Sequence, residues 1–321
     1  MSAQSIMIES SITRESNVLF EPVAAPADSK QVMEEISRLN AAGPLVSQSR
    51  YDVFLANADA IPAVLHEIGR LREISFRQVG EGSGYALDLD PFDQTYLHLF
   101  LWDRESCAVA GAYRIGRTDT LLAEFGPAGL YTSTLFELNQ PFLDHLNPGL
   151  ELGRSFIAPD YQRSIHPLAL LWRGICRLVS RFPRYTRLFG PVSISNDYSP
   201  ISQEVIVRFM RENRQNQDFA DWVRPLRPYN GIDLSAYAIS DRFHCIEDVS
   251  AVIASIEPDK KGVPVLLRQY LKLNATLLEF NRDLLFANVL DALVLVDLRD
   301  SADDVLGRYM GKDALSIFRA R

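Results

Sequence analysis

The segment 150–157, with the sequence LELGRSFI, places two opposite charges in a run that otherwise has the character of a buried strand. Glu151 and Arg154 lie three residues apart within it. Burying a carboxylate or a guanidinium is costly unless the charge is paired or has a function. We therefore expect the chain to fold around this strand, with the two charges forming either a structural ion pair or part of a reactive site.

Three further spaced pairs precede this segment and fall on expected helices and strands. They are Arg72 and Phe76, Asp90 and Asp93, and Gly111 and Arg114. Taken singly, each has an ordinary structural interpretation: the aspartates flank a proline, which is typical of a turn cap. His98 likewise lies on an alternating strand, where a buried core histidine is common. The four pairs in this order carry more information than any one of them.

Apolar periodicity predicts alternating strands and helices along the chain. Expected strands are 51–56, 96–102, 108–115, 150–157, 187–195, 275–280 and 292–298, and expected helices are 30–40, 61–77, 167–181, 202–214, 249–256 and 263–273. The turn at 103–106 predicts that the strands around it form an antiparallel hairpin. We divide the chain into a mobile N-terminal arm (1–48), a core (49–215) and a C-terminal lobe (216–321) that completes the site.

The spaced pairs, on these elements, resemble those of acyl-homoserine-lactone synthases and N-acyl amino acid synthases, which are built on the GNAT acetyltransferase fold. The segments 165–174, 189–198 and 262–273 resemble the N-acyltransferases of bacterial ornithine-lipid synthesis, a hemolysin-like family. The resemblance covers about residues 50–300. It implies an α/β (α+β) fold with a mixed, mostly antiparallel central sheet flanked by helices, and an additional C-terminal α/β lobe.

The same resemblance implies a reaction and its substrates. A long, often 3-hydroxylated, acyl chain would pass from acyl carrier protein to the α-amine of an amino acid, with ornithine as the leading acceptor and with glycine, serine, lysine and other amines left open. The product would be a lyso-aminolipid or an N-acyl amino acid. Two alternatives stay open: an acyltransferase that uses acyl-coenzyme A and a small amine, and a module that binds a carrier protein or lipid without catalysis.

The segment 162–169 favours a carrier protein over coenzyme A as the donor. Helix N-termini bind pyrophosphate through free backbone N–H groups, commonly in glycine-rich loops. This segment has no glycine, and its Pro167 lacks an N–H group. A carrier protein presents pantetheine through a single phosphate, so it needs less from this loop. The residues expected to dock it are Arg163, Arg173 and Arg177, in a stretch (161–214) with nine arginines and three acids.

Attack on a thioester needs an amine that has lost a proton, and the carbonyl oxygen needs a hydrogen-bond donor. Glu151 is our first candidate for the base and Asp93 the second, while Arg154 orders the acids or binds the acceptor carboxylate. Backbone N–H groups near Phe156 are expected to face the carbonyl oxygen. Expected substrate-binding residues are Arg72, Phe76, Asp90, His98, Arg114, Ser155, Phe156 and Asn196. We expect no resident cofactor and no metal, because acyl-phosphopantetheine is the donor and no His or Cys spacing fits a metal site.

Composition limits the remaining function classes. A net charge of −8 argues against a nucleic-acid partner, and three widely spaced cysteines indicate a reducing compartment. No signal peptide or long apolar stretch is evident, so we expect a cytoplasmic protein. The apolar segment 263–267 borders Lys260, Lys261 and Arg268, which predicts peripheral contact with the inner face of the cytoplasmic membrane.

Overall fold

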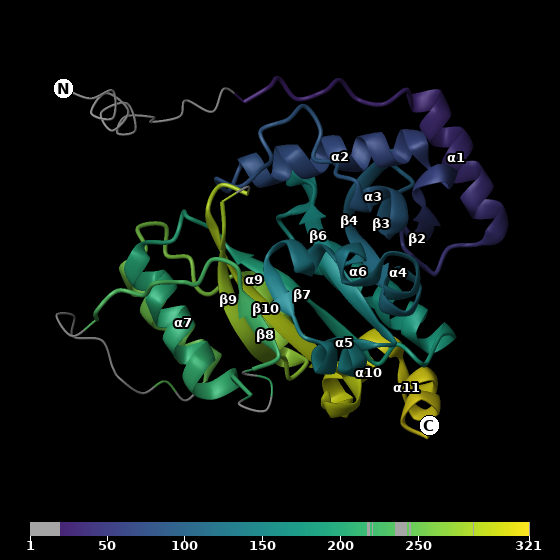
Figure 1. Ribbon diagram of the computed structural model, residues 1–321. Coiled ribbons are helices and arrows are strands. Elements are labelled where there is room, and N and C mark those ends of the chain that lie inside the picture. Colours follow the sequence, from purple (N-terminus) through teal and green to yellow (C-terminus); the bar gives the residue numbers. More distant parts are fainter. Residues whose placement is uncertain are drawn as a thin grey trace, which may run out of the picture.

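One large twisted sheet organises the molecule (Figure 1). The computed structural model describes residues 20–216, 219, 221–234, 243, 245–284 and 286–320. The strand order is β1-β2-β3-β4-β6-β7-β10-β9, and all neighbours are antiparallel except β6 and β7. The strands are β1 (Val46–Gln48), β2 (Tyr51–Asn57), β3 (Leu97–Asp103), β4 (Ala108–Arg117), β6 (Gly149–Ile157), β7 (Arg187–Ile194), β9 (Thr276–Asp283) and β10 (Val289–Asp297). A small second sheet pairs β5 (Phe136–Leu138) with β8 (Val223–Pro225).

Helices cover both faces of the large sheet, because both faces carry apolar side chains. One face packs against α6 (His166–Arg181), α7 (Pro200–Arg214), α8 (Ile246–Ile256), α9 (Val265–Lys272), α10 (Asp303–Met310) and α11 (Lys312–Arg319). The other face packs against α1 (Ser29–Ala42), α2 (Pro62–Arg77), α3 (Phe92–Thr95), α4 (Thr118–Phe125) and α5 (Gln140–Leu146). In α6 the buried residues Leu171, Ile175 and Val179 recur every four positions and form the apolar stripe that meets the sheet.

Strands β6 and β7 separate in the middle of the sheet. They pair in parallel only at three positions, where residues 149–151 of β6 meet residues 187–189 of β7. Beyond this point β7 continues as Gly190-Pro191, and Pro191 has no N–H group to donate to β6. On its other side β6 bulges, since Arg154 and Ser155 together face one residue of β4, and Arg154 has a positive φ of 47°. The two strands therefore open a gap at the centre of the fold.

The predicted architecture is confirmed: the fold is mixed α/β with a mostly antiparallel central sheet flanked by helices. The expected helix near 30–40 is α1, whereas residues 1–19 of the predicted arm lie outside the described residues. Strands β9 and β10, expected in a C-terminal lobe, extend the central sheet beside β7. The division at residue 215 stays a prediction, and the strands on its two sides belong to one sheet.

Candidate active site

A buried network of ion pairs fills the space between α2, α3 and the sheet. Arg72 on α2 binds Asp93 with two hydrogen bonds of 3.0 Å and Asp88 with one of 2.8 Å. Arg114 on β4 donates to Asp90 and, at 3.1 Å, to Asp93. Burial opposes the charge on Asp93, but Arg72 and Arg114 outweigh burial and hold its pKa below the usual range. Asp93 is therefore a firmly ionised carboxylate with little affinity for a further proton.

The other two predicted members of this network also find partners in it. The Nε atom of Arg154 lies 3.5 Å from a carboxylate oxygen of Asp88, and its Nη2 atom lies 3.6 Å from a carboxylate oxygen of Asp90. Arg154 therefore pairs with these two aspartates and not with Glu151. His98 contacts the carbonyl oxygen of Asp93 at 2.8 Å, and burial lowers its pKa. Six residues that the sequence analysis singled out thus meet in one cluster, with Asp88 as an added member.

Glu151 is fully buried, and its carboxylate fixes the loop that contains Tyr131 and Thr132. Its carboxylate accepts hydrogen bonds from the backbone N–H of Thr132 at 2.6 Å and of Tyr131 at 3.2 Å. The hydroxyls of Thr132 and Tyr96 also donate to it. Burial raises the pKa of Glu151, although the hydrogen bonds oppose that shift. Its oxygens already have partners, so the geometry favours a structural carboxylate, and the expected role as base stays a prediction.

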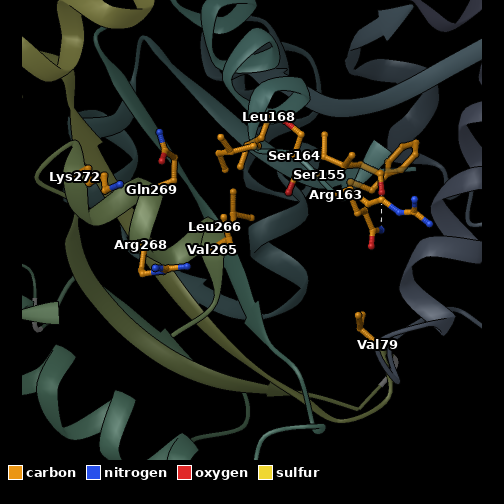
Figure 2. Close-up of a pocket in the computed structure, with 14 residues that line it drawn as sticks. Val79, Ser155, Arg163, Ser164, Leu168, Val265, Leu266, Arg268, Gln269 and Lys272 are labelled. Carbon is orange, nitrogen blue, oxygen red and sulfur yellow. Dashed lines mark hydrogen bonds between the residues drawn. The ribbon is translucent and has the colours of Figure 1, made fainter. Parts of the chain in front are cut away.

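Three adjoining cavities, which share lining residues, lie around the gap between β6 and β7. The α6–α9 cavity has a volume of about 760 Å³ and lies between the start of α6 and α9 (Figure 2). It shares Ser155 and Leu266 with a second cavity of about 110 Å³, which we call the acidic cavity. The acidic cavity in turn shares Tyr131, Arg154 and Asp283 with the β9 cavity, of about 580 Å³. Because α9 and α2 cover opposite faces of the sheet, the three adjoining cavities lie in a row from one face to the other, and we call this row the passage.

The α6–α9 cavity combines apolar walls with positive charge. Its apolar lining comes from Phe156 and Ile157 of β6, Leu168 of α6 and Val265 and Leu266 of α9. Its charged lining residues are Arg163, Arg268 and Lys272, and none of the fourteen lining residues is an acid. Such a lining suits an elongated ligand with an apolar part and an anionic group.

The acidic cavity contains carboxyl groups whose proton affinity is high. Asp291 on β10 is buried, and burial together with Asp283 raises its pKa to about 7. Burial, Asp291 and Asp197 raise the pKa of Glu81 to about 8. The hydroxyl of Ser193 on β7 donates to one oxygen of Asp291 at 2.8 Å. A carboxyl group that titrates near neutral pH inside a cavity is a candidate general base.

Arg154 places a positive charge beside these carboxyl groups. Its guanidinium lies over the rings of Tyr131 and Phe286, at 5.0 and 4.8 Å from their centres. Its Nη1 donates to the hydroxyl of Tyr131 at 3.3 Å, and this hydroxyl donates to Asp283 at 3.4 Å. The cavity therefore offers one cation and several carboxyl groups within a small volume, which matches the two charges of an α-amino acid.

The structure brings only some of the predicted substrate-binding residues to these cavities. Those that line a cavity are Phe76, Asp90, Ser155 and Phe156, together with Arg154. Arg72, Arg114 and His98 are buried in the ion-pair network instead, at 1% exposure each. Asn196 lies beyond the end of β7, where its amide donates to the carbonyl of Ala287 in the β9–β10 turn at 2.5 Å.

The three arginines expected to dock a carrier protein have different surroundings. Arg163 lines the α6–α9 cavity. Arg173 donates to Gln48 of β1, and Arg177 lines a small cavity beside Phe318 of α11. Arg173 and Arg177 lie four residues apart on α6, hence on one face of that helix, and neither lines the α6–α9 cavity. The docking role of all three stays a prediction.

The segment expected to touch a membrane is largely occupied within the protein. Leu267 belongs to the core, and Leu266 lines the α6–α9 and acidic cavities. Lys261 donates to the carbonyl of Asp197 at 2.9 Å and lies 3.4 Å from Asp259. Across the described ranges, no helix has the length and apolar character needed to cross a bilayer. Membrane contact and cytoplasmic location stay predictions.

The sequence analysis missed Glu81, Asp283 and Asp291. Asp291 interrupts an otherwise apolar run, VLDALVLV, and therefore carries the same signal that drew attention to Glu151. It was overlooked because the expected strand began one residue later, at 292. Glu81 lies in a glycine-rich loop, 80–84, where a single acid has no distinguishing pattern. Only the packing of this loop against β10 brings the two acids to one cavity.

Comparisons with known proteins give a domain match and two similar chains. Residues 71–173 match the sequence model of the acetyltransferase (GNAT) domain. The chain is 27% identical over 283 residues to a glycine N(alpha)-acyltransferase of Bacteroides thetaiotaomicron, covering 83% of each chain. It is 26% identical over 311 residues to a protein of the same name from Phocaeicola vulgatus, covering 91% of this chain and 93% of that one. The solved structure of a CoA-dependent acyl-homoserine lactone synthase, MesI, is similar at a TM-score of 0.38 and 11% identity, covering 81% of this chain and 95% of the other. That structural likeness is too low to carry an argument.

The match to the GNAT domain, together with relatives that are named N-acyltransferases, supports an acyltransferase. The predicted GNAT fold and acyltransferase activity are thereby confirmed. The narrower expectations of a carrier-protein donor and an ornithine acceptor go beyond these findings.

Proposed function

We propose that the protein transfers an acyl chain from a phosphopantetheine thioester, presented by an acyl carrier protein, to the α-amine of a small amino acid, with glycine as the leading acceptor. The observation that carries this proposal is the passage through the sheet. A cation-lined apolar cavity meets a small acidic cavity where β6 bulges at Arg154 and Ser155. A thioester donor and a charged amine thus have separate, chemically matched compartments that join at one point.

The acceptor assignment rests on the acidic cavity and on the relatives. The cavity has a volume of about 110 Å³, and it is lined by one guanidinium, that of Arg154, and by the carboxyl groups of Asp291, Glu81 and Asp283. This arrangement suits the carboxylate and ammonium of glycine and leaves little room for a side chain. Two relatives at 26–27% identity carry the name glycine N(alpha)-acyltransferase. Ornithine would have to place its second ammonium in the β9 cavity, which Asp90 and Asp283 line.

In the proposed mechanism Asp291 is the general base. A strand holds it in place, Ser193 fixes one of its oxygens, and its pKa near 7 lets it accept a proton from an ammonium at neutral pH. Asp93 is less suited, because two guanidinium groups lower its pKa. The acceptor ammonium gives one proton to Asp291, and the resulting amine attacks the thioester carbonyl. The new N–C bond forms, the C–S bond breaks, and the second surplus proton of the nitrogen leaves with the sulfur as a thiol.

The bulge on β6 supplies the environment for the thioester carbonyl. Within the described residues, β6 pairs with β7 no further than Glu151, so the backbone beyond it borders the gap on that side. Ser155 lines both cavities that meet there. We propose that backbone N–H groups near Ser155 and Phe156 stabilise the negative charge that develops on the carbonyl oxygen.

The acceptor is tested by thiol release from a long-chain acyl carrier protein thioester with glycine, alanine or ornithine. We expect glycine to give the highest kcat/KM, about tenfold or more above ornithine, because a small polar cavity excludes a longer charged side chain. Mass spectrometry of the product checks that the new bond is an amide.

Three outcomes would change the proposal. A preference for ornithine would reassign the acceptor and give the β9 cavity a role in binding its side chain. No release of thiol from a carrier-protein thioester or from acyl-coenzyme A, with any of these amines, would remove the transferase reaction. Faster turnover with acyl-coenzyme A than with the carrier protein would replace the donor only.

A further inference from the structure

Among the described residues, no acid lines the α6–α9 cavity beside its positive charges. Most arginines near the centre of the molecule are ion-paired, as Arg72, Arg114 and Arg154 are. By contrast, Arg268 and Lys272 form no ion pair with any residue that the structure describes. The Nε atom of Arg268 is buried without a hydrogen-bond partner among the described residues. A buried guanidinium nitrogen without a partner is unfavourable, and a bound anion would satisfy it.

Arg268 and Lys272 are also well placed to act together. They lie four residues apart on α9, hence on one face of the helix and one turn apart. Both line the α6–α9 cavity, and so does Leu266, which reaches the acidic cavity at the other end. Figure 2 shows Arg268, Gln269 and Lys272 on the α9 side of the cavity, with Ser155 and Arg163 on the opposite side. From Leu266 to Lys272 the helix advances by about 9 Å, at ~1.5 Å per residue.

We propose that Arg268 and Lys272 form the binding site for the phosphate of the donor's pantetheine arm. This rests on the proposed function, because it assigns the α6–α9 cavity to the donor. The arm lies along the apolar wall of the cavity, with its sulfur near Ser155 and its phosphate at the exposed end of α9. Helix α9 lies outside residues 71–173, the part that matches the GNAT domain, so this charge is supplied by the C-terminal part of the chain.

The absence of a glycine-rich loop before α6 supports this assignment. His166 and Pro167 open that helix, and Pro167 has no N–H group to offer an anion. The cationic side chains of Arg268 and Lys272, across the cavity on α9, can bind the phosphate in place of such a loop. A carrier protein and coenzyme A both present a phosphate at this point of the arm, so the site recognises chemistry that the two donors share.

Direct binding separates this inference from the transfer reaction. Calorimetric titration compares 4′-phosphopantetheine with pantetheine, which lacks the phosphate, on the full chain. We expect wild type to bind the phosphorylated arm about tenfold or more tightly than pantetheine, since hydrogen bonds to charged groups are strong. Arg268→Ala should remove most of that difference and leave the affinity for pantetheine unchanged, whereas Arg268→Lys should restore part of it.

The matched control is Arg308→Ala, which removes an exposed arginine of α10 that pairs with Asp304, away from the cavity. It should leave both affinities as in wild type. Equal affinity of wild type for the two arms, or an equal loss of both in Arg268→Ala with unchanged thermal stability, would overturn the phosphate site. Neither result depends on turnover. The phosphate site can therefore be confirmed when no transfer reaction is found, and it can be overturned when the transfer reaction is found.

Kinetics with the two natural forms of the donor then identify the source of the phosphate. If the carrier protein is the donor, Arg268→Ala should lower kcat/KM with its acyl thioester by about tenfold or more, and acyl-coenzyme A should be a poor substrate for wild type. Efficient use of acyl-coenzyme A with the same tenfold loss would assign the site to that donor. An unchanged kcat/KM with both donors would contradict the proposed site.

Discussion

Two buried carboxyl groups, Asp291 and Glu151, show how one residue type can serve different ends at the scale of single residues. Glu151 accepts hydrogen bonds from the backbone of residues 131 and 132 and from two hydroxyls. Asp291 accepts a hydrogen bond from Ser193 and lines the acidic cavity. Both have a raised pKa because of burial, but only Asp291 is next to space that a substrate can enter.

Asp291→Asn keeps the shape of the side chain and removes its ability to take a proton. We expect turnover to fall by about 10² or more. For wild type, kcat/KM should rise as the pH increases through about 7, because the base must be deprotonated to act. The residual activity of the variant should lack that rise. Steady-state rates between pH 5 and 9 (~4 units around the expected midpoint) measure both effects.

The same substitution should stabilise the fold at high pH. Folding raises the pKa of Asp291 from its unfolded value of about 3.9, so the protonated form contributes stability below pH ~4 that is lost as the pH rises through about 7. The difference in melting temperature, variant minus wild type, should therefore increase between pH 4 and 8. Glu151→Gln is the control: it should lower stability by about 1–3 kcal/mol, because an amide group would face hydrogen-bond donors, and leave the pH midpoint of activity unchanged. If instead Glu151→Gln abolished the pH dependence, Glu151 would be the base.

At the scale of elements, Gly190 controls how β7 leaves β6. A Cβ atom on Gly190 would lie 2.1 Å from the carbonyl oxygen of Leu152, a backbone atom that cannot swing aside. We expect Gly190→Ala to lower the free energy of unfolding by about 1–3 kcal/mol, measured by denaturant titration. Gly153→Ala on the neighbouring strand is the matched control, since a Cβ atom there meets nothing within 4 Å and should leave stability unchanged. Equal stability of the two variants would show that the strands can separate further without cost.

Most elements could be predicted from the sequence, because their apolar periodicity is long enough to read. Strand β6 (Gly149–Ile157) and helix α6 (His166–Arg181) fall within one or two residues of expectation. The region 118–148 received no prediction. It contains α4 and α5, of eight and seven residues, and short 3₁₀ turns, which are too brief for a periodic pattern. The loop that Glu151 holds lies in this region, so its role could not be inferred from sequence.

At the scale of the whole molecule, the site depends on both ends of the chain. The ion-pair network, from Arg72 to Arg154, was recognisable from residue spacing, because its members come from neighbouring elements. The acidic cavity was not recognisable in this way, because it depends on the pairing of β10 with β7. About 100 residues of chain separate these strands, so no short sequence pattern indicates that they pair. The sequence thus indicated the framework of the site, and the tertiary pairing of β10 supplies the proposed base.

A chain that ends at residue 215 tests whether the predicted core is a folding unit. Strand β10 pairs with β7 at eight positions and carries Asp291. Without it, β7 would present a long apolar edge, which is prone to aggregation. We expect the shortened chain to be inactive and to lack a cooperative thermal transition by circular dichroism. A cooperative transition would show that residues up to 215 fold as a domain on their own.

The passage through the sheet has a mouth on each face, and this separates two kinds of evolutionary change. Substitutions on α9 and before α6 act on one mouth, whereas substitutions in the loop 80–84 and at the end of β9 act on the other. Evolution could therefore change the specificity for the donor while the specificity for the acceptor stays the same, or the reverse. The residues that line the donor cavity and the acceptor cavity share little beyond Ser155 and Leu266. In such a scaffold the donor cavity and the acceptor cavity would change independently in evolution, while the separated strands β6 and β7 between them stay the same.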